Sequence, residues 1–254
     1  MMKKLFYVAM ACGLLSTGTV CMAQKAAPAY AFSELPKVDI KKFKKNDKGA
    51  YVIFDGTSLE GWRGYNKDHV PNRWIIDEGT LHFTKTPAGV DKPEGGDIIF
   101  ASDLKNFELE FEWKISHAGN SGMFVLAKEI KDQPIYVSSR EYQWLDNENH
   151  PDAKQGVDGN RKSASLYDMI PASPQNGNPA GEWNKAKIVV NNGKISHYQN
   201  DKLVVEYSVW TPEWTALLQK SKFSEEKWPL AYELLNNVGG KSKSGVIGFQ
   251  DHGD

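Results

Sequence analysis

The segment Glu141–Asp146, which reads Glu-Tyr-Gln-Trp-Leu-Asp, alternates polar and aromatic side chains. In a β-strand this period of two places Glu141 and Gln143 on one face and the aromatic residues on the other. A carboxylate beside a carboxamide can bind a polyol and move a proton to or from it. The same pattern also suits an ordinary solvated strand face. Asp146, at the end of the segment, is a further candidate catalytic carboxylate.

Two other short segments, Gly119–Gly122 and Gln250–Gly253, combine glycine with polar side chains. In the first, Asn120 lies between residues that tolerate left-handed backbone, which leaves backbone N–H groups accessible. In the second, Gln250 and His252 share one face by the period of two, and histidine titrates near neutral pH. We take Asn120 and Gln250 as candidate ligand-binding residues and His252 as a candidate acid or base. A plain turn and a surface histidine are the alternative interpretations.

A long loop, His150–Lys162, contains a basic pair at its end. Arg161 of this pair could hold a hydroxyl group of a ligand or an oxyanion that develops during a reaction. A solvated basic pair is the simpler interpretation of the same residues.

Several motifs of known enzymes are absent from the sequence. It contains no HExxH, CxxC or GxSxG, the motifs of zinc proteases, of dithiol or metal sites and of serine hydrolases. The Glu-x-Asp-x-Glu spacing of many sandwich glucanases is also missing, because Gln143 stands at the position of the central Asp. The sequence therefore does not support an ordinary glycosidase with two catalytic carboxylates on this strand.

Short apolar runs separated by Gly, Asn, Asp and Pro indicate that these residues are positioned by β-strands. The clearest strand runs from Phe107 to Ile115, where apolar and charged residues alternate. Asn-Gly at 192–193 suits a type I′ turn, and a second turn at 200–201 completes a predicted three-stranded meander over 184–207. Other strands are expected at 51–54, 73–76, 80–84, 97–100, 122–127, 140–145, 164–170 and 245–250.

One segment has the signals of a helix. Thr211 can cap its N-terminus, Pro212 suits the first position, and Trp214, Leu217 and Leu218 fall on one face. The stretches 146–163 and 221–244 read as long irregular connections, which in a compact domain are usually functional. We therefore predict an all-β sandwich with one short helix.

The first residues resemble a signal peptide. Lys3 and Lys4 precede an apolar run, and Cys21-Met22-Ala23 ends in the small residue that precedes cleavage. We expect residues 1–23 to be removed on export to the periplasm or outer surface, so that both cysteines are lost and the mature chain has no integral membrane segment. Residues 24–49 read as a solvated arm or linker, and 50–254 as one domain.

Composition excludes some partners and favours others. The 31 Lys and Arg residues nearly balance the 32 Asp and Glu residues, which gives no electrostatic footprint for nucleic acid. The eight Trp, ten Tyr and eleven Phe residues suit a carbohydrate partner, since aromatic faces stack on sugar rings. Aromatic side chains are also common in sandwich cores.

Taken in order, segments of this chain resemble the 3-keto-disaccharide hydrolase domain family. The matching segments are Phe54–Trp62, Asn120–Gly122, Glu141–Asp146, Ser165–Asp168, Gly181–Asn184, Ser221–Phe223 and Gln250–Gly253. The resemblance implies a concanavalin-like jelly roll, export, and action on glycosides oxidised at C3. It also adds Tyr167 to the candidate substrate-binding residues.

The implied substrate suggests a mechanism. A ketone at C3 acidifies the C2 proton, so a base can remove it and the C1 substituent can leave by β-elimination, with water added later. We expect Glu141 and His252 to be base and acid in an order that the sequence leaves open, with Asp146 as a third candidate. Asn120, Gln143 and Gln250 would hold hydroxyls, and Arg161 or a bound divalent cation would stabilise the enolate.

Two other functions remain open at the level of sequence. The same fold and aromatic residues serve non-catalytic carbohydrate-binding modules. A conventional glycosidase acting on unoxidised glycans is the second alternative, and a structural or adhesion role comes last because nothing in the chain repeats.

Overall fold

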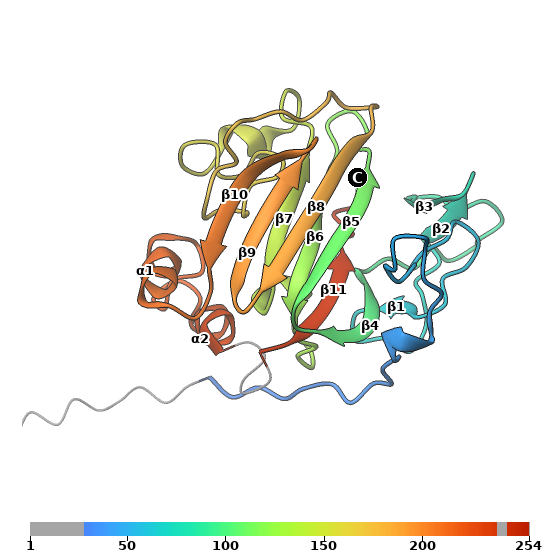
Figure 1. Ribbon diagram of the computed structural model, residues 1–254, viewed down its shortest axis with the longest axis horizontal. Helices are drawn as coiled ribbons and strands as arrows, with labels where there is room; N and C mark the ends of the chain where they lie inside the picture. The colour runs from blue at the N-terminus through green and yellow to red at the C-terminus, as the bar shows by residue number, and fades with distance from the viewer. Residues whose placement is uncertain (1–27, 238–242, 254) are drawn as a thin grey trace, which may run out of the picture.

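The computed structural model describes residues 28–237 and 243–253, which form two stacked antiparallel β-sheets and a small third sheet. One sheet has the strand order β1-β4-β11-β6-β7 and the other β10-β9-β8-β5, and Figure 1 shows the second lying in front of the first. The strands of the five-stranded sheet are β1 (Trp62–Gly64), β4 (Ile98–Leu104), β11 (Gly245–Phe249), β6 (Asn120–Ala127) and β7 (Arg140–Leu145). Those of the four-stranded sheet are β10 (Lys202–Ser208), β9 (Lys194–Gln199), β8 (Asn184–Asn191) and β5 (Phe107–Trp113).

Short elements complete the fold. The two-stranded sheet pairs β2 (Trp74–Asp77) with β3 (Thr80–Phe83). Two α-helices, α1 (Pro212–Lys220) and α2 (Pro229–Asn237), contact each other beside the sheets. The 3₁₀ turns are η1 (Ile40–Lys42), η2 (Ile135–Val137) and η3 (Pro151–Lys154). The predicted all-β sandwich is confirmed.

The predicted meander is also confirmed, and its turns explain it. Asn192 and Gly193 have φ angles of 49° and 86°, and Asn200 and Asp201 have φ angles of 46° and 65°. Two successive positive φ angles are those of a type I′ turn, whose twist matches that of the paired strands. The sequence therefore fixes the register of β8, β9 and β10 locally.

Aromatic side chains fill the space between the two sheets. Trp144 of β7 stacks on Trp113 of β5, with ring centroids 5.7 Å apart and an interplanar angle of 1°. Tyr142 of β7 is fully buried, and its hydroxyl donates to the Tyr198 carbonyl of β9 over 3.2 Å. Because Tyr142 and Trp144 point into the sandwich, the alternate residues of β7 must point away from it. Phe249 of β11 extends this cluster, 5.4 Å from Trp144.

Three predicted elements differ from the structure. The described residues form two α-helices rather than one, because α2 lies in the stretch predicted as irregular and buries Ala231, Leu234 and Leu235 on one face. Residues 51–54 make only an isolated bridge between Tyr51 and Lys45. Residues 164–170 form turns instead of a strand, since positive φ angles at Ala164 and Asp168 interrupt an extended backbone.

The described part of the predicted arm, residues 28–49, is largely exposed but contacts the core through a few apolar residues. Val38, Ile40 and Phe43 pack against the core, and the Val38 N–H donates to the Ala101 carbonyl over 2.8 Å. Lys-rich sequence had suggested exposure, but the apolar residues between the lysines dock this segment on the five-stranded sheet. The proposed signal peptide at 1–23 lies outside the described residues. No helix among the described residues is long and apolar enough to span a membrane.

Candidate functional site

Glu141 occupies the outer face of the five-stranded sheet, on the side of β7 opposite the aromatic core. It is only 8% exposed. A glycine on the neighbouring strand β6 makes room for it, because a Cβ atom at Gly122 would lie 2.6 Å from Glu141 Oε1. The sequence thus seats this carboxylate directly against the backbone of β6, as the period of two on β7 predicted.

The surroundings of Glu141 oppose its ionisation. Burial raises the pKa of its carboxyl group to about 8, and the nearby Asp97 and Asp152 carboxylates act in the same direction. The Lys222 ammonium and a hydrogen bond from Gln250 act in the opposite direction. A carboxyl group with a pKa close to the working pH of an enzyme suits general acid–base chemistry.

Lys222, the cation that faces Glu141, was not assigned a role from the sequence. Its Nζ lies 4.3 Å from the centroid of the Tyr167 ring, and its backbone N–H donates to Asp168 Oδ2 over 2.9 Å. Burial lowers the pKa of its ammonium group, and the charges of Glu141 and Asp168 oppose that change. The sequence marked Lys222 through the family-matching segment Ser221–Phe223 and through its place in a long connection, and neither showed that the side chain turns inward.

Arg161 is held by ion pairs rather than presented to a ligand. Its Nε donates to Asp168 Oδ1 over 2.7 Å and its Nη1 to Asp152 Oδ1 over 2.8 Å. Asp152 also accepts a hydrogen bond of 2.8 Å from the Tyr167 hydroxyl. Arg161 therefore fixes the ring on which Lys222 lies, which favours a positioning role over the enolate contact expected from the sequence.

A chain of hydrogen-bonding side chains links β7, β6 and the segment after β11. The Gln143 carboxamide lies 2.9 Å from Glu141 Oε1 and 3.1 Å from Asn120 Oδ1. Asn120 Nδ2 in turn lies 3.3 Å from His252 Nε2. Glu141 and His252, far apart in sequence, are therefore linked through two carboxamides, and their assignment as base and acid stays a prediction. Gln143 is fully buried, so its partners are these neighbours and not a sugar hydroxyl.

Gln250 lies where the sequence placed it, next to Glu141. Its backbone N–H donates to the Gly122 carbonyl over 2.9 Å, and its side chain forms a hydrogen bond with Glu141. The Oε1 atom of Gln250 is buried and has no hydrogen-bond partner among the described residues. This buried acceptor beside Glu141 is therefore an unsatisfied polar atom of the site.

Asp146, the third candidate carboxylate, binds backbone groups of its own loop and of the connection between β5 and β6. Its oxygens accept from the N–H groups of Ala118, Glu148 and Asn149 over 2.8, 3.1 and 3.2 Å. These hydrogen bonds outweigh burial and lower the pKa of the carboxyl group. The geometry favours a structural role, and the mechanism proposed below does not use Asp146.

Asp97 carries a partly buried carboxyl group that was not predicted from the sequence. Burial raises its pKa to about 7, while the backbone N–H of Asp251 donates to it over 2.8 Å. Asp251 itself accepts from the Gly96 N–H over 2.7 Å through Oδ2. In the sequence, Asp97 stands just before a buried strand, and this position did not indicate that its charge would raise the pKa of Glu141.

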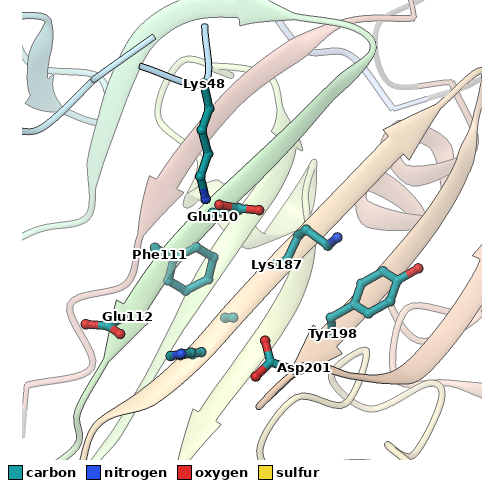
Figure 2. Close-up of a pocket in the computed structure, with 9 residues that line it drawn as sticks. Lys48, Glu110, Phe111, Glu112, Lys187, Tyr198 and Asp201 are labelled. Carbon is teal, nitrogen blue, oxygen red and sulfur yellow. The ribbon is translucent and has the colours of Figure 1, made fainter. Parts of the chain in front are cut away.

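Two cavities differ in their relation to Glu141. A void of about 10 Å³, close to the space of one water molecule, borders Glu141, Tyr167 and Phe223. A much larger concavity of about 590 Å³ lies on the outer face of the other sheet. Figure 2 shows Lys48 reaching toward Glu110 across it.

The charged side chains that line the larger concavity are paired across its strands. Its charges alternate across the strands, with Glu110 opposite Lys187 and Glu112 opposite Lys185. Opposite charges in register are typical of a solvated sheet face. We therefore place the candidate site at Glu141.

The sequence analysis left open a divalent cation that stabilises the enolate, but the described residues do not form a cluster of ligands for one. No group of three or more His, Cys, Asp or Glu side chains within 28–237 and 243–253 is arranged to hold a metal ion. The cationic group that the structure does place near Glu141 is the ammonium of Lys222.

Comparisons with known proteins agree on a family. A 3-keto-alpha-glucoside-1,2-lyase-like domain matches residues 49–254. A protein of Bacteroides thetaiotaomicron named 3-keto-disaccharide hydrolase is 51% identical, over 100% of this chain and 96% of that protein. Two solved structures from Parabacteroides distasonis, both assigned as glycosyl hydrolases, are also similar. One is 25% identical with a TM-score of 0.65, covering 80% of this chain and 87% of its own. The other is 26% identical with a TM-score of 0.54, covering 78% and 89%.

Proposed function

The chain belongs to the 3-keto-alpha-glucoside-1,2-lyase-like family, and from that premise we propose that it cleaves glycosides and disaccharides oxidised to a ketone at C3. Glu141 is the proton-transfer group of the proposed site. The observation that supports this assignment is the burial of Glu141 against Gly122 beside a single cation, which raises the pKa of its carboxyl group to about 8.

The proposed reaction is an elimination. Glu141 removes the proton from C2, and the electron pair of the broken C–H bond forms the enolate across C2, C3 and the ketone oxygen. When the enolate collapses, a double bond forms between C1 and C2, and the bond from C1 to the leaving oxygen breaks. The leaving oxygen takes a proton, and water added across the double bond afterwards completes net hydrolysis.

The residues around Glu141 supply what this reaction needs besides a base. Lys222 places a positive charge beside Glu141, where it can stabilise the enolate oxygen. His252 lies at the other end of the site, next to Asn120, and serves as the acid that protonates the leaving group. The buried Oε1 of Gln250 accepts a hydrogen bond from a substrate hydroxyl. A second carboxylate across the anomeric carbon is not required.

The test is to incubate the protein with 3-keto-trehalose or a 3-keto-glucoside, with and without a chelator, and to identify the products by mass spectrometry. An unsaturated, glucal-type product indicates elimination, and a product that has gained water indicates completed hydrolysis. Activity lost with the chelator would add a divalent cation to the site. Binding without turnover would favour a carbohydrate-binding module, and turnover of unoxidised nitrophenyl glycosides a conventional glycosidase.

We also propose that the protein is exported, on the basis of the positive, apolar and small-residue pattern of residues 1–23. N-terminal sequencing of the protein from the periplasm or cell surface should then begin at Gln24. A soluble cytoplasmic protein that retains Met1 would contradict export.

A further inference from the structure

Glu141 and His252 are joined by two buried carboxamides. Gln143, which is 0% exposed, and Asn120, which is 6% exposed, lie between them. The three links measure 2.9 Å from Glu141 Oε1 to Gln143, 3.1 Å from Gln143 to Asn120, and 3.3 Å from Asn120 to His252 Nε2. Each link has the length of a hydrogen bond.

A carboxamide has one donating end and one accepting end, so the two amides must point the same way along this chain. If the Gln143 nitrogen donates to Asn120 Oδ1 and the Asn120 nitrogen donates to His252, then Gln143 Oε1 faces Glu141. Two facing oxygens at 2.9 Å need a proton between them, so Glu141 must then be protonated. His252 Nε2 must at the same time be an acceptor without a proton.

Turning both amides over reverses every link. The Gln143 nitrogen then donates to Glu141 Oε1 over 2.9 Å and to the Ser121 carbonyl over 3.2 Å, and Gln143 accepts from Asn120. This arrangement requires an ionised Glu141. The oxygen of Asn120 now faces His252, so Nε2 must carry a proton. The Ser121 carbonyl stabilises this second arrangement.

We propose that Gln143 and Asn120 form a relay of positioning residues that sets the tautomer of His252 according to whether Glu141 holds a proton. The relay rests on the proposed function, because it couples the protonation state of the base in that reaction, Glu141, to the tautomer of the acid, His252. With Glu141 ionised and ready to accept the C2 proton, Nε2 of His252 is protonated and directed to Asn120. After Glu141 has gained the proton, the amides turn over and Nε2 becomes an acceptor, with the ring proton exchanged through solvent to Nδ1. Loss of the Glu141 proton to solvent then returns the amides and the ring to the first arrangement.

Other charged groups face the two ends of the relay and act on both states. Glu141 also interacts with Lys222, Asp97 and Asp152. The His252 ring lies 6.0 Å from that of His150. The relay differs from these groups because it consists of two uncharged carboxamides, so substitution of Gln143 or Asn120 tests it without removing a charge.

The experiment observes the His252 ring directly, without substrate. The whole protein is labelled with ¹⁵N-histidine, and the ¹⁵N shifts of Nδ1 and Nε2 are followed as pH rises, with the His252 signals assigned by their loss in His252→Gln. The ¹³C shift of the Glu141 carboxyl group is followed in parallel. On the neutral ring, the population protonated at Nε2 should rise in step with the ionisation of Glu141, at about pH 8.

Two variants and a control make the test specific. Gln143→Leu removes both ends of one amide, so the step at His252 should vanish while the Glu141 titration remains. Asn120→Asp accepts at both ends, so Nε2 should stay protonated throughout. The control is Gln175→Leu. The Gln175 carboxamide forms hydrogen bonds with Asn147 and Ser163 outside the relay, so this variant should behave like the unmodified protein.

The proposal is overturned by a His252 tautomer that does not change while Glu141 titrates, or by a step that persists in Gln143→Leu. Amide spectra of each variant establish that it is folded. If Gln143→Leu folds poorly, Asn120→Asp still tests the relay, because it should keep Nε2 of His252 protonated at every pH. Failure to turn over a 3-keto-glucoside would defeat the proposed function and leave the spectroscopic step intact, so the two failures are distinguishable.

Discussion

At Glu141, a single carboxyl group experiences burial, one cation and two like charges. Glu141 can act as a base only when its carboxyl group is ionised, whereas burial favours the protonated form. We therefore expect kcat/KM for a 3-keto-glucoside to rise with pH and level off above about pH 8, where the free enzyme holds Glu141 ionised. Glu141→Gln should lower kcat by roughly 10²–10⁴-fold with a much smaller change in KM. A flat pH profile together with full activity of Glu141→Gln would remove this residue from the mechanism.

The same burial means that an ionised Glu141 lowers the free energy of unfolding. Its pKa is higher in the folded chain, at about 8, than the ordinary value of 4.5. The folded state therefore binds the proton more tightly, and the free energy of unfolding falls as pH rises from about 4.5 to about 8. Glu141→Gln should be more stable than the unmodified protein by on the order of a few kcal/mol at pH 9 and by little at pH 4. Urea denaturation across this range measures the difference, and equal gains at both pH values would contradict it.

Lys222 is the second residue whose charge should matter. Lys222→Met keeps the aliphatic chain over Tyr167 and removes the cation, so the enolate loses its stabilisation and the pKa of Glu141 rises further. We expect kcat to fall by about 10²-fold or more and the pH profile to shift upward. Lys187→Met is a matched control, because Lys187 Nζ lies 4.7 Å from the Tyr198 ring centroid on the opposite sheet. Equal losses in both variants would show that the charge of Lys222 has no specific role.

Sequence could predict the residues whose position depends on local periodicity. Glu141 and Gln143 share a face because a strand has a period of two, and the same rule turns their aromatic neighbours into the core. Lys222 and Asp97 escaped prediction because their burial depends on loops that return from other parts of the chain. Arg161 was assigned to the substrate because its partners, Asp152 and Asp168, could not be paired from spacing alone.

Among the elements, β6 and β7 determine whether Glu141 is correctly seated. Gly122→Ala would put a methyl carbon 2.6 Å from Glu141 Oε1, so the carboxylate must move away from the substrate. We expect a loss of kcat comparable to that of Glu141→Gln, with the protein still folded. Gly248→Ala on β11 is the contrast, because its Cβ would meet the Ile98 carbonyl at 2.5 Å and should lower the melting temperature. Unchanged activity of Gly122→Ala would show that Glu141 need not lie against β6.

Helices and strands were predicted correctly where a complete pattern lay within one short segment. They were missed where the local pattern was incomplete or typical of another element. The Asn-Gly turn and the alternation of β5 define their own strands. The helix α2 carried an apolar spacing at Ala231, Leu234 and Leu235, but no capping residue marked its start in the way that Thr211 marks α1. The segment 164–170 has strand-like composition, yet its N–H and C=O groups bond β7 from a turn conformation.

For the molecule as a whole, the docked N-terminal segment changes the expected limits of the stable core. Trypsin should cleave slowly between residues 28 and 49 despite the lysines there, because Phe43 packs on Phe100 with ring centroids 5.1 Å apart. Phe43→Ala should release the segment and make it the first site of cleavage. Phe32→Ala is the control, since Phe32 is 56% exposed. Rapid trimming of the unmodified protein to about residue 50, seen by mass spectrometry, would restore the solvated-linker interpretation.

The position of β11 has a consequence for how the protein is made. Residues 245–249 lie in the middle of the five-stranded sheet, between β4, whose Phe100 pairs with Ile247, and β6, whose Met123 pairs with Phe249. While the ribosome is still synthesising the preceding residues, β4 and β6 have no strand between them, and this sheet cannot close. The nascent chain therefore stays open until late in translation, with apolar strand edges that a chaperone can hold. Under the export proposed above, an open chain of this kind would remain competent for threading through a narrow membrane channel, and Gln250 and His252 would join Glu141 only after that passage.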